Sequence, residues 1–144
     1  MTYSLPQGAR RSRSAQAYAS IGLETKVFSA SPEHLITLLF DGAQAAIAKA
    51  RLYMENGNTE GRGMAISKAI DIVDSGLKAS IDMEAGGELA INLTATYELV
   101  IRNLLLANLN ADLAKLNLAD RLLTEIGDAW RTSVDPSRSE ASSL

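Results

Sequence analysis

The stretch "IDMEAGGELAINL" (81–93) separates two long apolar segments, and its conformation decides the fold. Two glycines, Gly86 and Gly87, stand among three carboxylates: Asp82, Glu84 and Glu88. Adjacent glycines permit a backbone reversal, and a negative charge near the first turn of a helix is favoured by the helix dipole. An open turn offers no environment that separates the pKa values of two carboxylates, as acid–base catalysis needs. We therefore predict a joint between two helices, the second of which begins near Gly87.

The segment before this joint contains the signals of three further helix termini. Ser31 is a good N-cap, and Pro32 fits the first helical position, where its missing N–H has no cost. This first helix ends at "ENGN" (55–58), where Gly57 can adopt the left-handed conformation of a helix C-terminus. A second helix then starts near Asn58 or Thr59. Together with the short joint "NLNAD" (108–112), these signals predict four helices, at about 31–55, 58–82, 87–108 and 112–132.

Each predicted helix carries one apolar stripe at the three- and four-residue spacing of an amphipathic helix. The stripes are Leu35, Leu39, Ala43, Ala46 and Ala50; Ile66, Ala69, Ile70, Val73, Leu77 and Ile81; Leu89, Leu93, Tyr97, Val100, Leu104 and Ala107; and Leu116, Ala119, Leu123, Ile126 and Trp130. No window shows the alternation of a β-strand. Because short connections force neighbouring helices to be antiparallel, we predict an all-α fold, an up-down four-helix bundle over residues 31–132.

The flanking segments differ in composition from the bundle. Residues 1–14 mix Pro, Gly, Ser and Arg without periodicity, and we predict a disordered basic tail there, as well as a disordered tail over 133–144. Residues 15–30 are moderately apolar but too broken for a helix of the bundle. We expect this segment to be a partly ordered N-terminal cap that lies across leftover apolar surface and is displaced by a partner.

Composition excludes several classes of function. The chain has no Cys and a single histidine, His34, and it contains no Glu-x-x-His pair, so we expect no catalytic residues, no metal site and no cofactor. Residues 21–144 contain 11 basic and 17 acidic side chains, a net charge of −6, which argues against nucleic acid as a partner. No apolar run reaches the roughly 20 residues of a membrane span, and no apolar stretch follows the N-terminal arginines. We expect a cytosolic protein without a secretory signal or stable membrane insertion.

The third helix carries more apolar residues than a core stripe requires. Its second set lies opposite the core stripe and is interrupted only by Glu98 and Arg102; it consists of Ile91, Ala95, Leu99, Leu105, Leu106 and Leu109. Weaker extra sets occur in the second helix (Met64, Ala65, Ile72 and Ala79) and in the first helix (Leu38, Ala45 and Leu52). Either the third helix is central and touches three neighbours, or the surplus forms an exposed groove for a partner segment.

Several short stretches, in this order and spacing, carry a family resemblance. They are "SPEHLITLLFDGA" (31–43), "AISKAIDIVDSGLKASID" (65–82), "GGELAINL" (86–93), "ANLNAD" (107–112) and "AW" (129–130). From about Ala15 to Trp130 the chain resembles the FliS family, the flagellin export chaperones of the flagellar type III secretion system. In the third helix it departs from the family, which tends to have a second Tyr and paired Arg there.

The resemblance implies a small cytoplasmic chaperone without catalytic activity. Such proteins bind the disordered C-terminal segment of flagellin in hydrophobic grooves, keep it from polymerising early and help present it to the export gate protein FlhA. An N-terminal Ala-Tyr pair of the family, linked to the cap and to export-gate contact, falls on Ala17 and Tyr18. With Ile21, these are the expected cap and export-gate residues.

Together, the surplus and the resemblance predict a flagellin-binding surface. Its expected residues are Ala65, Ile72, Ile91, Ala95, Leu99, Leu105 and Leu106. The alternative is a self-associating structural bundle that uses the same apolar surface to form a homodimer. We expect the free protein to be a monomer or a weak homodimer.

Overall fold

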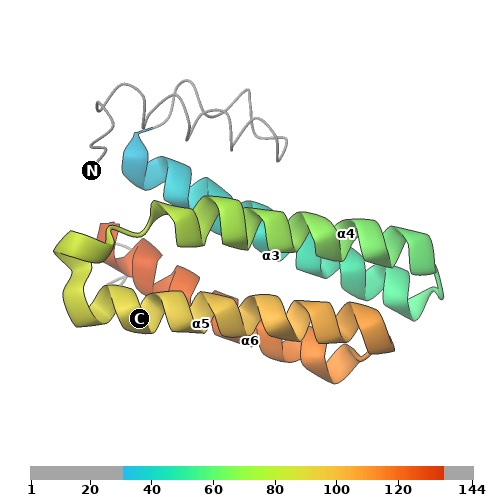
Figure 1. Cartoon of the computed structure of the whole chain (residues 1–144). Coiled ribbons are helices and arrows are strands. Elements are labelled where there is room, and N and C mark those ends of the chain that lie inside the picture. Colours follow the sequence, from blue (N-terminus) through green and yellow to red (C-terminus); the bar gives the residue numbers. More distant parts are fainter. Residues whose placement is uncertain (1–30, 135–144) are drawn as a thin grey trace, which may run out of the picture.

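The computed structural model of the protein describes residues 31–134, which are helical almost throughout and contain no strand. Their α-helices are α3 (Pro32–Glu55), α4 (Thr59–Asp71), α5 (Met83–Asn110) and α6 (Leu113–Val134). A π-helical turn, η1 (Ile72–Leu77), and a 3-10 turn, η2 (Lys78–Ser80), extend α4. Figure 1 shows that each helix runs antiparallel to the one before it. The predicted all-α four-helix bundle is confirmed.

The helices form the four corners of the bundle. Helix α3 packs against α4 and α6, and α5 packs against α6 and against α4 with its two extending turns. Helices α3 and α5 therefore occupy diagonal corners (Figure 1). The suggestion that the third helix is central and touches three neighbours is wrong. Because α5 has extensive packing with only two neighbours, its outer side is left without a partner among residues 31–134.

Side-chain caps fix the first two helix starts where the sequence places them. The Ser31 hydroxyl accepts a hydrogen bond from the backbone N–H of His34 at 3.2 Å. Gly57 has φ +71°, the left-handed conformation expected after α3. The Asn58 side chain then accepts a hydrogen bond from the N–H of Gly61 at 2.9 Å, so α4 begins at Thr59. Each of these bonds satisfies a donor that a helix N-terminus leaves unpaired.

The joint over 81–93 differs in detail from the expectation. Asp82 caps a helix start by accepting from the backbone N–H groups of Glu84 and Ala85, at 3.1 and 3.0 Å, so α5 begins four residues earlier than predicted. After one turn, Gly87 kinks the helix with φ 53° and ψ −130°. Gly86 has another role, because a Cβ there would lie 2.6 Å from the Cβ of Ala90. A carboxylate and two glycines thus shape the joint.

Replacing Gly87 by Ala is expected to lower the free energy of unfolding by about 1–3 kcal/mol, because only glycine adopts this backbone conformation without strain. Urea denaturation followed by circular dichroism measures the change. The matched control is Gly63→Ala in α4, where a Cβ would meet only Asn108 Oδ1 at 3.9 Å. That variant should be neutral or gain about 0.5–1 kcal/mol. Equal effects of the two substitutions on the free energy of unfolding would contradict a special backbone requirement at Gly87.

The ends of the last two helices extend beyond their predicted limits. Helix α5 continues through Asn110, and only Ala111, in a left-handed conformation with φ 50°, and Asp112 separate it from α6. Asp112 accepts a hydrogen bond from the N–H of Lys115 at 3.2 Å, which caps α6. Helix α6 reaches Val134, two residues beyond the expected end of the bundle at 132. The predictions for 1–30 and 135–144 lie outside the described residues.

The predicted stripes supply most of the core. Its largest fully buried side chains come from every corner of the bundle: Leu39, Phe40, Ile47, Ile66, Ile72, Val73, Val100, Leu104, Leu116 and Leu123. The prediction that Leu89 lies in the core is wrong, because its side chain is exposed. It lies in the first turn after the Gly87 kink, where the buried side of α5 begins only at Ala90.

Candidate partner-binding surface

The outward side of α5 is an apolar surface that no described part of the chain covers. Leu99 is 47% exposed, Leu105 54% and Ile91 59%. Ala95 and Leu109 are also exposed, and Leu106 is half-buried. We call these six residues, together with Glu98 and Arg102, the outer face of α5. Their spacing places them on one side of a helix, opposite the buried stripe of Tyr97, Val100, Leu104 and Ala107.

Two residues expected on this surface are buried instead. Ile72 has no exposed surface, and Ala65 is 8% exposed; both belong to the hydrophobic core. Helix α4 and its extending turns pack against both α3 and α5, so their buried arc is wider than one stripe. Residues beside the main stripe are therefore enclosed. The expectation that Ala65 and Ile72 lie on the flagellin-binding surface is wrong.

Ion pairs and hydrogen bonds to α4 and its extending turns lie along the edge of the outer face that adjoins them. Lys78 Nζ lies 3.5 Å from Glu98 Oε1 and 3.4 Å from Asp74 Oδ1, so one cation is shared by carboxylates of two helices. At the other end of the seam, the Arg62 guanidinium donates to the side-chain and backbone oxygens of Asn108, at 3.2 and 3.0 Å. These contacts hold α5 beside α4, and no other helix within 31–134 covers its apolar outer face.

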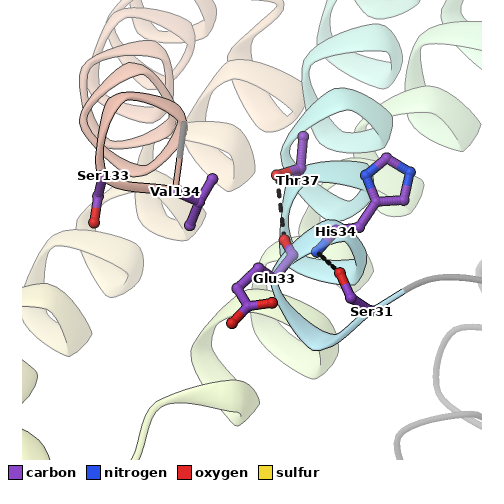
Figure 2. A pocket seen from close by; sticks show the side chains of 6 residues that line it. All are labelled: Ser31, Glu33, His34, Thr37, Ser133 and Val134. Atoms are coloured by element: carbon purple, nitrogen blue, oxygen red, sulfur yellow. Dashed lines mark hydrogen bonds between the residues drawn. The ribbon is translucent and has the colours of Figure 1, made fainter. Parts of the chain in front are cut away.

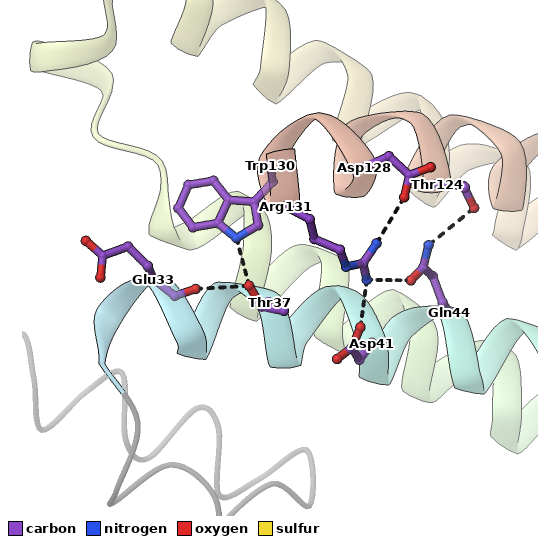
Figure 3. Close-up of polar contacts among 8 residues, drawn as sticks. All are labelled: Glu33, Thr37, Asp41, Gln44, Thr124, Asp128, Trp130 and Arg131. Carbon is purple, nitrogen blue, oxygen red and sulfur yellow. Dashed lines mark hydrogen bonds and ion pairs between the residues drawn. The ribbon is translucent and has the colours of Figure 1, made fainter. Parts of the chain in front are cut away.

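A second polar cluster closes the seam between α3 and α6, on another side of the bundle (Figure 3). Arg131 Nη2 donates to Asp41 Oδ1 at 2.6 Å and to Gln44 Oε1 at 2.8 Å. Nearby, the Trp130 indole N–H donates to the Thr37 hydroxyl at 3.0 Å. These bonds tie the start of α3 to the end of α6, and they give this seam a structural role.

Sequence reasoning missed Arg131, although a signal was present. Arg131 follows Leu123 and Gly127 at four-residue intervals, so it continues the buried stripe of α6. A Cβ on Gly127 would lie 3.1 Å from both Arg131 Nη1 and the Phe40 ring. A glycine one turn before a charged residue in a core stripe thus marks the space that a buried guanidinium needs.

A polar hollow lies at the same end of the bundle, between the first turn of α3 and the last turn of α6 (Figure 2). Ser31, Glu33, His34, Thr37, Ser133 and Val134 line it. The Ser31 hydroxyl already caps α3, and the Thr37 hydroxyl donates to the Glu33 carbonyl at 3.2 Å. Within residues 31–134, no three His, Asp or Glu side chains gather closely enough to hold a metal ion. The outer face of α5 is therefore the candidate functional surface.

Comparison with known proteins identifies the family. The family model described as flagellar protein FliS matches residues 14–137. This chain belongs to the FliS family. It is 48% identical over 116 residues to the flagellar secretion chaperone FliS of Salmonella typhimurium, covering 81% of this chain and 86% of that protein. It is 43% identical over 122 residues to the FliS chaperone of Escherichia coli, covering 85% of this chain and 90% of that protein.

A third relative, the flagellar secretion chaperone FliSB of Pseudomonas aeruginosa, is 37% identical over 118 residues, covering 82% of this chain and 93% of that protein. The family assignment confirms the resemblance predicted from the sequence. All three relatives are named flagellar secretion chaperones. A secretion chaperone, as these relatives are named, acts on a client.

The long α5 of this FliS-family chain also meets the length and composition criterion for a membrane-crossing helix. This criterion tolerates up to two charged residues in its window, so it is met even though the sequence has no uninterrupted apolar run of about 20 residues. A helix with a core stripe on one side and an apolar face on the other meets this criterion as well. In this bundle, the buried stripe of α5 packs against α4 and α6. That the protein does not insert stably into membranes stays a prediction.

Tyr97, on the buried side of α5, gives the FliS-family bundle a pH dependence. Burial raises the pKa of its phenol above the ordinary value of about 10. The unfolded chain therefore loses this proton first, and stability falls above about pH 10, by up to about 1.4 kcal/mol per pH unit. The difference in unfolding free energy between wild type and Tyr97→Phe should change between about pH 9 and about pH 11. A pH-independent difference would refute this assignment.

Proposed function

We propose that this FliS-family protein is a cytosolic chaperone that binds the disordered C-terminal segment of flagellin along the outer face of α5. Binding prevents premature polymerisation and aids delivery to the export gate protein FlhA. The observation that supports this proposal best is the row of exposed apolar side chains on α5: Ile91, Ala95, Leu99, Leu105 and Leu109. The relatives support a client of the flagellar secretion route, because they are named flagellar secretion chaperones. That the client is flagellin rests on the family resemblance.

The physical reason for such binding is the match between two apolar surfaces. A flagellin segment that assembles by helix packing must expose apolar stripes while it is unpolymerised. A helix that lies along the outer face of α5 buries those stripes, with a gain of about 25 cal/mol per Å² of apolar area. A disordered client loses conformational entropy on binding, so the contact must be extensive. The outer face runs from Ile91 to Leu109, about five turns of α5, and offers such length.

The N-terminal segment belongs to the same proposal. Ala17, Tyr18 and Ile21 lie outside the described residues, and their roles rest on the family resemblance. We propose that they cover apolar surface in the empty chaperone and contact the export gate after the client has bound. Deleting residues 1–30 should then strengthen client binding and weaken binding to the cytoplasmic part of FlhA. An equal loss of both would point instead to a folding role for this segment.

A homodimer is the other occupant that this apolar surface could accept. Sedimentation equilibrium over a wide range of protein concentration distinguishes the two states. The chaperone proposal expects the mass of a monomer, or a weak dimer that dissociates when the flagellin segment is added. A tight dimer that keeps its mass in the presence of flagellin would favour the structural alternative.

The test of the proposed function is calorimetric titration of the full-length chaperone with a synthetic peptide of the C-terminal segment of flagellin from the same organism. We expect saturable one-to-one binding with a negative heat-capacity change, the mark of apolar burial. Light scattering of full-length flagellin should also show delayed polymerisation when equimolar chaperone is present. Absence of binding, together with unchanged polymerisation, would overturn the proposal.

A further inference from the structure

A single positive charge stands in the middle of the outer face of α5. Arg102 is exposed, and its helical neighbours three residues away on either side are Leu99 and Leu105. Within residues 31–134, every ion pair of an arginine involves Arg51 or Arg131, so Arg102 has no carboxylate partner there. The face is thus an apolar strip with a cation at its centre.

The neighbouring acid does not neutralise this cation. Glu98 lies one turn before Arg102, at a spacing that allows an ion pair. Its carboxylate instead pairs with Lys78 from the adjoining turn of α4, with Nζ 3.5 Å from Oε1. Glu98 therefore already has a partner from its own chain when another molecule covers the face, whereas Arg102 has no ion-pair partner among residues 31–134.

Covering the outer face would remove water from both charges. A charge that loses its water is tolerated only when an opposite charge or several hydrogen bonds replace the water. We propose that the client helix presents an acidic side chain to Arg102, and that this pair sets the register and orientation of the client on α5. The occupant is thus an amphipathic helix whose apolar stripe contains one Asp or Glu. This inference rests on the proposed function and adds the chemistry of the client.

The pair would serve specificity more than affinity. An apolar strip of Leu and Ile allows a client helix to slide by a turn at small cost, because similar side chains recur along it. One charged pair at a fixed position penalises every register in which Arg102 meets an apolar residue. A planar guanidinium also binds a carboxylate through two parallel hydrogen bonds, which fixes orientation.

The experiment measures the dissociation constant of the flagellin peptide for full-length wild type, Arg102→Met and Arg102→Glu. The methionine variant keeps an apolar stem of similar length and removes the charge. We expect it to weaken binding by about tenfold or more. The wild-type affinity should fall between about 50 mM and about 500 mM salt, whereas the affinity of Arg102→Met should change less. Arg121→Glu, an exposed charge reversal on α6, is the matched control and should leave binding unchanged.

The reciprocal exchange identifies the partner residue. Peptides in which each Asp or Glu is replaced in turn by Lys should bind wild type less well at one position. That peptide should regain affinity for Arg102→Glu.

The inference fails if Arg102→Met binds the peptide as tightly as wild type while a Leu99→Asp, Leu105→Asp double variant does not bind. The guanidinium then reaches solvent at the rim of the contact, and the proposed function stands. If wild type does not bind the peptide at all, both proposals fail.

Discussion

Replacing Ile72 by Asp is expected to unfold the bundle. Ile72 has no exposed surface and lies in η1, the turn that packs against both α3 and α5. An Asp there would carry an unpaired charge into the core, and the packing of the isoleucine side chain would be lost. The combined cost exceeds about 4 kcal/mol, which approaches the whole stability of an ordinary domain. Far-ultraviolet circular dichroism at 25 °C should show loss of helix or a greatly lowered urea midpoint.

The matched control for this substitution is Met64→Asp, on α4 of the same helical segment. Met64 is 69% exposed, so its replacement should change stability by no more than about 0.5 kcal/mol. The two variants distinguish a role of Ile72 in the core from a role at the client-binding surface, where the sequence predicted it. A folded Ile72→Asp variant that had lost only flagellin binding would show that the core placement is mistaken.

The double substitution Leu99→Asp, Leu105→Asp should abolish client binding without unfolding the protein. Each leucine is about half exposed, and burying the exposed half contributes about 1 kcal/mol. Each new carboxylate would be desolvated without a partner, at a cost of about 1–3 kcal/mol. The affinity for the flagellin peptide should therefore fall by about 100-fold or more. Titration calorimetry measures the loss, and circular dichroism checks that the helix content is unchanged.

Leu52→Asp is the control for this experiment, because it makes one of the same Leu-to-Asp changes at an exposed leucine elsewhere. Leu52 is 59% exposed and belongs to α3, the corner of the bundle diagonal to α5. Peptide affinity should remain within about twofold of the wild-type value. Equal losses from Leu52→Asp and the double variant would indicate a general effect of negative charge. Such a result would contradict client binding at the outer face of α5.

Sequence patterns predicted the helices well because their signals are local. Ser31, Pro32, Gly57 and Asn58 act within one turn of the chain, and the structure places each at the predicted helix end. The prediction of where α5 starts was less accurate, because Asp82 caps a single helical turn that precedes the Gly87 kink. The sequence pattern places the joint at the double glycine, whereas Asp82, four residues before Gly86, begins the helix.

The candidate surface was only partly predictable, because burial beside a stripe depends on how many neighbours a helix has. The helical spacing places Ile72 outside the main apolar stripe of its own helical segment. In the same way, it places Leu99 outside the main apolar stripe of α5. Only the packing shows that Ile72 faces two helices, whereas Leu99 faces no other helix of the part of the chain that the structure describes. The Lys78–Glu98 pair joins residues from different helices, so no spacing within one helix could indicate it.

Whether flagellin covers the outer face of α5 can be observed directly by methyl NMR of the full-length chaperone. With leucine and isoleucine methyl groups labelled, the flagellin peptide is added to saturation. We expect the methyl signals of Ile91, Leu99 and Leu105 to shift and to show contacts to peptide protons, while those of Leu52 stay unchanged. Unchanged Leu99 and Leu105 signals, with shifts confined to another side of the bundle, would contradict this expectation.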